Sequence, residues 1–390
     1  NKRTPYDMLR ANASDAEFAG PGRIQFFANG FQLLDTDPSR NSSGGNYIYL
    51  AFAADGSTAT PSLASSFDTE VWLGNGSTRT INYGFKPDLW FAKNYTATNG
   101  YGHYWAWFDS IRGGNSVIHS NATNAANTNL SGTGSNAIDF VNNGISINTT
   151  GNSGYNESGF NNVGYAFKAG GLSSINTDGS ITSLVSANQA AGFSIVQFNS
   201  TSAANSTIGH GLSAAPDLVI AKRYDSTGNW AVQVPPLSNG YLLLNSTQAL
   251  NASDTSIWNA TAPTSSVFTA AGGSGKFFNA GSFMSYCFTS IAGYSKVGTY
   301  SGTASANSIT TGFEPGFIMI KRTDSTGSWV VMDSARGMGS NAYALFPNLN
   351  ASESNNWKTA FTATGFTISS AEAWINASGG TYIYLAIKEN

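Results

Sequence analysis

The chain has 390 residues, of which only 11% are charged, and a net charge of -3. Asn, Ser, Thr and Gly must therefore supply most of the polar surface. No basic patch stands out among the 19 basic and 22 acidic residues, which argues against counterion-driven binding to nucleic acid. No apolar run is long enough to cross a bilayer, so we expect no membrane insertion. The single cysteine, Cys287, excludes an intrachain disulfide framework.

The chain repeats itself in units that each carry an opening and a closing anchor. The opening anchor, a Gly-Phe/Leu start followed by an apolar run and a lysine, occurs three times. The closing anchor occurs four times, and its first and last copies are nearly identical. This count indicates that the first unit is a half. The opening anchors lie at 84–93, 211–230 and 312–329, and the closing anchors at 41–52, 156–167, 279–288 and 376–387.

These anchors predict the organisation of the chain from its N-terminus. Units of about a hundred residues fit whole β-sandwich domains better than solenoid repeats. The direct junction between the last two units predicts a semi-rigid rod of domains. The predicted parts are a C-terminal half-sandwich at 1–55, a linker at 56–67, a sandwich with an insertion at 68–169, a linker at 170–192, and sandwiches at 193–292 and 293–390.

The half-unit raises a question of partners. A sandwich without its opening strands exposes sheet edges, and proteins normally cover such edges. We therefore expect residues 1–55 to pair with strands from another chain, from a preceding segment or from another part of this chain.

Within a unit, short apolar runs alternate with turn signals, which is typical of antiparallel strands. Residues 317–320 predict a strand buried on both faces, 324–327 a tight turn, and 329–332 the returning strand. The closing strand at 382–387 has two apolar faces. We predict a mostly β fold of tandem β-sandwich domains of the jelly-roll type. One face of the closing strand carries Tyr382, Tyr384 and Ala386, and the other Ile383, Leu385 and Ile387.

The densest aromatic segment, 101–108, overlaps the end of an insertion at 94–102 that only the 68–169 unit carries. Exposed rings two residues apart could stack on the apolar faces of sugars. Trp105 aligns with Trp230 and Trp329, which favours a place in the core. For the neighbouring aromatic residues, core packing and glycan binding both stay open. The candidate glycan-binding residues are Tyr101, His103, Tyr104 and Trp107.

Two Asp–Arg pairs follow the aligned tryptophan strands, Asp109 with Arg112 and Asp333 with Arg336. An ion pair that braces a turn is the favoured interpretation, and contact with a glycan is the alternative. No nucleophile elbow, phosphate loop or zincin motif occurs, so we predict no catalytic residues and no enzyme activity.

Metal binding has little support. The three histidines are not spaced as metal ligands, and His210 fits a Gly-His-Gly turn. We expect no cofactor and no metal site, with calcium as the alternative, because residues 35–37 and 176–179 offer oxygen ligands for it but fall short of a full set. Cys287 fits a buried apolar position.

The stretches 178–188, 191–196, 208–212 and 215–222, together with the closing strand, resemble repeats of bacteriophage tail-fibre and virion surface proteins, notably from marine and cyanobacterial phages. The resemblance covers nearly the whole chain. It implies a lectin-like sandwich in a non-enzymatic, extracellular protein of the virion surface. The implied partners are host-surface glycans and other virion subunits, and such fibres are commonly homotrimers. The 68–169 unit departs from the pattern because its insertion replaces the Asp-Ser-Thr-Gly turn.

Two other functions remain open. A decoration or stalk protein would bind other virion subunits and no receptor. A secreted bacterial adhesin would use the same lectin-like modules. The departure from the repeat pattern points to the 68–169 unit as the place for specialised binding in either case.

Overall fold

The computed structural model describes residues 7–8, 18–19, 24–27, 30–38, 40–47, 49, 63–96, 104–128, 130, 136–149 and 154–389. Apart from the turn η1 (Leu63–Ser65) and the short helix α1 (Ala373–Asn376), the regular elements in these ranges are strands. The predicted mostly β class is confirmed. No helix in this described part is long and apolar enough to cross a membrane.

The folded body consists of three units, which we number unit 1 (63–169), unit 2 (170–290) and unit 3 (291–389). Each unit has one large and one small antiparallel sheet. In unit 1 the large sheet has the order β5-β12-β7-β8-β9 and the small one β10-β11-β6. The strands of unit 1 are β5 (Phe67–Leu73), β6 (Arg79–Asn82), β7 (Leu89–Asn94), β8 (Ala106–Asp109), β9 (Ile118–His119), β10 (Ile138–Val141), β11 (Gly144–Ile147) and β12 (Asn161–Phe167).

Unit 2 has the widest sheet, in the order β13-β14-β15-β21-β17-β18-β19, opposite the pair β16-β20. Its strands are β13 (Ser174–Asn176), β14 (Ser183–Asn188), β15 (Phe193–Ser200), β16 (Ser206–Gly209), β17 (Leu218–Arg223), β18 (Trp230–Val234), β19 (Ser238–Leu243), β20 (Val267–Ala270) and β21 (Gly281–Phe288).

Unit 3 has a large sheet in the order β22-β28-β24-β25 and a small one in the order β23-β27-β26. Its strands are β22 (Ser295–Ser301), β23 (Asn307–Thr310), β24 (Phe317–Arg322), β25 (Val330–Asp333), β26 (Thr359–Thr362), β27 (Gly365–Ile368) and β28 (Thr381–Ile387). The predicted hairpin is present, because β24 pairs with β25 from Phe317↔Asp333 to Ile320↔Val330.

The linker predicted at 170–192 is wrong, because this segment forms β13 and β14 of the unit 2 sheet. β14 pairs with β15 from Ser183↔Phe198 to Asn188↔Phe193. Its richness in Ser, Thr and Ala suggested a linker, yet Val185 and Ser186 are buried. In the linker predicted at 56–67, η1 occupies residues 63–65 and β5 begins at Phe67, while 56–62 lie outside the described residues.

The central strands of each large sheet are buried on both faces, which explains their apolar sequences. The outer face packs on the small sheet of the same unit and forms a local core. The inner face contributes to one cluster that contains residues of all three units. In β28, Tyr382 and Tyr384 belong to the local core and Ile383 and Leu385 to the shared one, as the alternation predicts.

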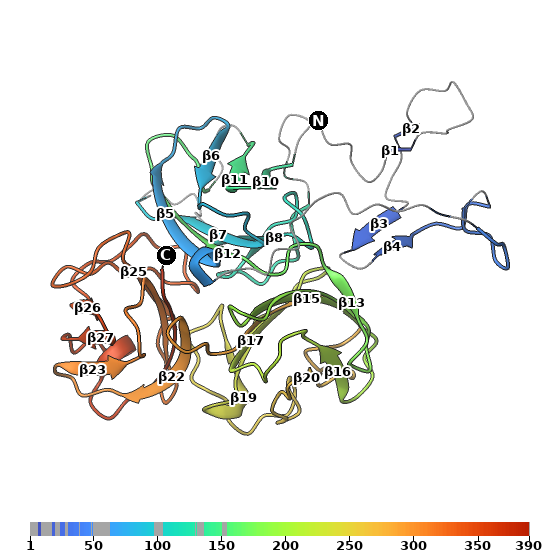
Figure 1. The fold of residues 1–390 in the computed structure, drawn as a ribbon. Coiled ribbons are helices and arrows are strands. Elements are labelled where there is room, and N and C mark those ends of the chain that lie inside the picture. Colours follow the sequence, from blue (N-terminus) through green and yellow to red (C-terminus); the bar gives the residue numbers. More distant parts are fainter. Residues whose placement is uncertain are drawn as a thin grey trace.

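The shared core makes the three units one ring and shows that the predicted rod of domains is wrong. Phe67 of unit 1 contacts Phe317 of unit 3, with ring centroids 5.5 Å apart. Phe167 contacts Phe193 and Phe288 of unit 2 at 5.3 and 5.8 Å. The three lobes surround a common centre in Figure 1. A sheet with two apolar faces needs two covering layers, and neighbouring units provide the second.

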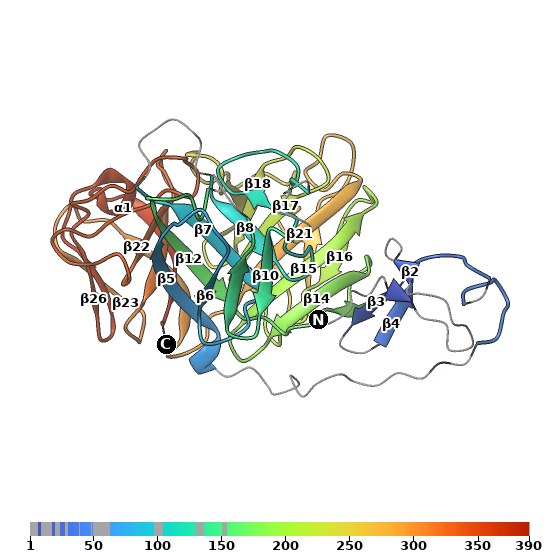
Figure 2. The ribbon, with the colours of Figure 1, turned by 90° about the horizontal axis from the view of Figure 1, so that it is seen from above.

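The N-terminal strands stand apart from this ring in both views (Figures 1 and 2). Among the described residues, β1 (Asp7–Met8) pairs with β2 (Phe18–Ala19), and β3 (Ile24–Phe27) with β4 (Gly30–Leu33). No strand pairing joins these described residues to 63–389. Completion of the half-sandwich by another chain or a preceding segment stays a prediction.

Candidate functional site

The most elaborate polar chemistry lies at the three seams between units, where one set of contacts recurs cyclically. At each seam a buried tryptophan donates its indole N–H to a backbone carbonyl of the neighbouring unit. The three contacts run from unit 1 to unit 3, from unit 2 to unit 1, and from unit 3 to unit 2. They are Trp105 Nε1 to Phe346 O, Trp230 Nε1 to His119 O and Trp329 Nε1 to Leu243 O, each 2.9 Å.

Backbone hydrogen bonds close the same ring. In each unit a backbone N–H donates to the carbonyl of the residue that follows a large-sheet strand of the next unit. Because the third of these bonds joins units 3 and 1, the ring is closed rather than open. The bonds are Ala126 N to Tyr224 O (2.8 Å), Leu250 N to Thr323 O (2.9 Å) and Glu353 N to Tyr95 O (2.9 Å).

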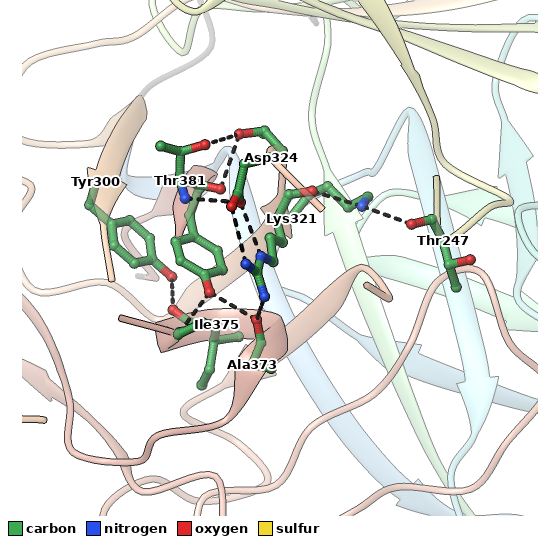
Figure 3. Close-up of polar contacts among 11 residues, drawn as sticks. Thr247, Tyr300, Lys321, Asp324, Ala373, Ile375 and Thr381 are labelled. Carbon is green, nitrogen blue, oxygen red and sulfur yellow. Dashed lines mark hydrogen bonds and ion pairs between the residues drawn. The ribbon is translucent and has the colours of Figure 1, made fainter. Parts of the chain in front are cut away.

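A lysine that is fully buried sits at the same place in each unit: Lys93, Lys222 and Lys321. Lys222 Nζ donates to Thr123 O of unit 1 at 3.0 Å, and Lys321 Nζ donates to Thr247 O of unit 2 at 3.3 Å (Figure 3). Buried ammonium groups need such acceptors, because desolvation disfavours their charge. Burial lowers the pKa of Lys93 to about 7 and the pKa of Lys222 and Lys321 to about 8.

The buried lysines predict an unusual pH dependence. The folded lysines bind fewer protons than the unfolded chain between about pH 8 and 10.5, so the free energy of unfolding should rise with pH across this window. Urea titrations followed by tryptophan fluorescence at pH 7.5, 8.5 and 9.5 measure this rise. We expect Lys222→Met to reduce the rise and Lys86→Met, at an exposed site, to leave it unchanged. An identical rise in both variants would contradict the assignment.

Two seams carry a buried Tyr–Asp–Arg triad. Asp109 accepts hydrogen bonds from Arg112 Nε at 2.6 Å and from the Tyr286 hydroxyl of unit 2 at 2.9 Å. Asp333 accepts from Arg336 Nε at 2.8 Å and from the Tyr165 hydroxyl of unit 1 at 2.7 Å. Both Asp–Arg pairs are ion pairs at 2.6 Å with side chains at most 1% exposed.

The third seam, between units 2 and 3, replaces all three members of the triad. The strand pairing places Val234 where the other units have an aspartate, and Leu385 where they have Tyr165 and Tyr286. Leu237 stands three residues after Val234, at the position of the arginine. Val234 and Leu385 are buried in the shared core, and the partly buried Leu237 packs against it. The seam has therefore exchanged a complete polar set for a complete apolar set.

The structure separates the predicted glycan-binding residues. Trp107 is 4% exposed and stacks on Phe91 at 4.3 Å, so it belongs to the core and the prediction that it contacts a glycan is wrong. Tyr104 is 43% exposed, with its ring 5.0 Å from that of His119. Tyr101 and His103 lie outside the described residues. Strand alternation could not reveal that the face carrying Trp107 is covered by unit 2.

The remaining candidates have local partners. Asp109, Arg112, Asp333 and Arg336 brace their turns, because Asp109 and Asp333 also accept the backbone N–H of the arginine three residues on. This geometry leaves their carboxylates and guanidinium groups buried and unable to touch a glycan.

His210 is buried, with Nε2 3.1 Å from Thr264 O while Nδ1 accepts the N–H of Leu212. Burial raises the pKa of Cys287 to about 12, as expected for an apolar thiol. In the loop predicted as a calcium candidate, Arg40 forms ion pairs with Asp35 and Asp37. In the other, Asn176 and Asp178 bond each other. Across the described ranges no cluster of three His, Cys, Asp or Glu side chains could hold a metal ion.

Only some of the residues at the seams could be predicted from the sequence. The aligned tryptophans predicted a core position, and the three lysines lie in the opening anchors. The acceptors of these side chains in neighbouring units, and the contacts of Tyr165 and Tyr286, became visible only in the structure. These arrangements hold units together and orient no reactive group towards solvent. The fold and its seams define a class: a closed ring of three fused, non-identical β-sandwich units.

Residues 1–55 and 62–390 match the family described as Domain of unknown function (DUF7483), and the chain belongs to that family. No curated protein and no solved structure matches the chain.

Proposed function

We propose that this chain is a non-enzymatic module of the virion surface, part of a tail fibre or similar appendage, and that it attaches to host-surface glycans. The observation that carries the proposal is the ring itself. Three sandwiches lock one another in place, while one corner carries a longer loop than the other two. A rigid support with a specialised loop is the arrangement that recognition proteins commonly use.

The specialised loop joins β7 to β8 and spans residues 95–105, against 224–229 in unit 2 and 323–329 in unit 3. Its end is fixed by Trp105 and its beginning by Tyr95, whose carbonyl bonds to Glu353 of unit 3. Both anchors connect this loop of unit 1 to unit 3. Tyr104 is the exposed aromatic residue next to the Trp105 anchor, and it is the ring we assign to sugar stacking.

Tyr104→Ala should weaken glycan binding by the full chain. Truncating an aromatic anchor costs about 2 kcal/mol, which corresponds to roughly a thirtyfold rise in Kd. Binding to a glycan array, followed by titration against the best ligand, measures the change. Tyr49→Ala is the matched control, because Tyr49 is 76% exposed but lies far from this loop in the sequence.

Three results would redirect the proposal. Equal loss in both variants would place the binding elsewhere. Binding to no glycan, together with near-capsid copy number in purified particles, would favour the decoration protein that binds other virion subunits. Cleavage of a polysaccharide by the purified chain would contradict the non-enzymatic assignment.

The decoration protein, which would bind other virion subunits, stays the second candidate. The predicted trimer of whole chains stays a prediction. One chain already contains three units arranged in a ring. Attachment therefore does not require three chains to create a threefold arrangement.

A further inference from the structure

The seam between units 1 and 3 differs from the others in its chemistry. It joins β5 to a segment some 320 residues later, and Glu389 spans it. The Glu389 carboxylate accepts the backbone N–H of Thr69 at 3.1 Å on the unit 1 side. On the unit 3 side it accepts the hydroxyl of Ser334. One side chain thus bridges the two edges that close the ring.

The chain makes room for this bridge at Gly316. A Cβ at that position would overlap the Cβ of Glu389. Units 1 and 2 have Asp88 and Asp217 at the matching position, and these carboxylates hold their own unit's exit segment. Asp88 accepts from Ala169 N at 2.8 Å and Asp217 from Ser290 N at 2.8 Å. In unit 3 the acidic side chain is instead Glu389, which bonds to Thr69 of unit 1.

Other acidic groups face this bridge. Asp68 and Glu70 flank Thr69 on β5, and the Thr69 N–H donates to Asp68 Oδ1 at 3.0 Å as well as to Glu389. The carboxyls of Asp68, Glu70 and Glu389 are all only partly exposed. The charges acting on Asp68 come from Glu389 and Glu70, and the charge acting on Glu389 comes from Asp333. Asp333 is itself balanced by Arg336 at 2.6 Å.

The adjoining segments carry two basic side chains, Lys168 after β12 and Lys388 beside Glu389, and neither is among the charges that shift these three carboxyls. Ionising the three carboxyls together therefore adds negative charge on both sides of the seam. Carboxylates held close in a partly buried site repel one another, which favours the protonated forms.

We propose that Glu389, Asp68 and Glu70 form a pH-dependent latch that closes the ring between units 1 and 3 and loosens when the three carboxyls ionise. Burial, followed by the charge of Glu389, raises the pKa of Asp68 to about 7, and burial likewise raises the pKa of Glu70 and Glu389. Because the closed seam binds more protons than the open one between about pH 4 and 7, closure weakens as the pH rises through this window. The latch acts whatever the ring binds.

Hydrogen exchange of the full chain tests the latch, because exchange reports local opening. Protection of Phe67–Leu73, corrected for the intrinsic rate, should fall at least about tenfold between pH 5 and 8, since one pKa unit corresponds to a tenfold change. The triple variant Asp68→Asn, Glu70→Gln and Glu389→Gln should keep its protection across this range. A matched variant, Glu157→Gln, Glu314→Gln and Glu372→Gln, should behave as the wild type.

Constant protection of β5 in the wild type would overturn the proposal. So would an equal loss at β22 (Ser295–Ser301), which is the corresponding edge strand of unit 3, because the opening would then be global. If the triple variant fails to fold, Glu389→Gln alone serves as the test, because its amide oxygen can still accept the N–H of Thr69. The fall in protection of Phe67–Leu73 between pH 5 and 8 should then be at most half of the wild-type fall. An unchanged response in that single variant also contradicts the latch.

Discussion

Replacing Asp109 by alanine is expected to lower the free energy of unfolding by about 3–5 kcal/mol, because it leaves a buried guanidinium without its carboxylate. Arg112 would keep only uncharged partners, namely the carbonyls of Ser116 and Trp107 and the hydroxyls of Ser116 and Tyr286. The Tyr286 hydroxyl would lose the carboxylate to which it donates across the seam. Urea unfolding of the full chain measures the loss. Because the three units share a core, we expect one transition rather than a separate transition for unit 1.

Two further variants grade this effect. Asp333→Ala should cost about 1 kcal/mol less than Asp109→Ala, because Arg336 keeps Glu353 at 3.3 Å as a second carboxylate partner. Asp324→Ala removes a surface pair with Arg322 at 3.0 Å and should cost about 1 kcal/mol or less. If Asp109→Ala were no worse than Asp324→Ala, the triad would not hold the seam.

The second large effect concerns the apolar seam between units 2 and 3. Leu385→Tyr places a phenol where the other seams have one, but Val234 and Leu237 offer it no acceptor. We expect a loss of about 2–4 kcal/mol from the extra volume and the unsatisfied hydroxyl. Thermal and urea unfolding of the full chain measure it. Leu385→Phe carries nearly the same volume without the hydroxyl, so the difference between the two variants isolates the polar part.

Restoring the whole triad should reverse much of that loss. The triple variant Leu385→Tyr, Val234→Asp and Leu237→Arg should be more stable than the sum of its single changes by about 1–3 kcal/mol, because the matching side chains of the other two seams are hydrogen-bonded to one another. The order of addition matters, since Val234→Asp alone buries an unpaired carboxylate. Strict additivity of the single changes would show that Leu385 does not occupy the position of Tyr165 and Tyr286.

Much of each unit could be predicted from the sequence. The alternation in 382–387 places its two apolar faces correctly, and the aligned Trp105, Trp230 and Trp329 are all buried at 0–1% exposure. The first result follows from strand periodicity, and the second from the alignment of the three units. The Asp–Arg spacing likewise predicts the turn-bracing ion pairs, because three residues suffice to return a side chain to its own turn.

The ring could not be predicted in the same way. A strand with two apolar faces requires a second covering layer, but its sequence does not say whether a helix, a sheet or a neighbouring unit provides that layer. Trp107 shows the consequence, because its face is covered by Trp230 and Tyr286 of unit 2 at 5.2 and 5.5 Å. The prediction of a linker at 170–192 was wrong for a related reason, since small polar residues fit both a linker and the outer strands of a sheet.

Fusion of the three sandwiches into one chain changes how this protein can evolve. In an assembly of identical subunits, a substitution at one contact surface appears at every contact surface, and a longer loop appears at every corner. Here Val234, Leu237 and Leu385 could diverge at one junction while Tyr–Asp–Arg sets stayed at the other two, and only the β7–β8 corner acquired an insertion. A receptor that engages that corner would meet one contact point per body, so tight attachment would have to come from many bodies acting together.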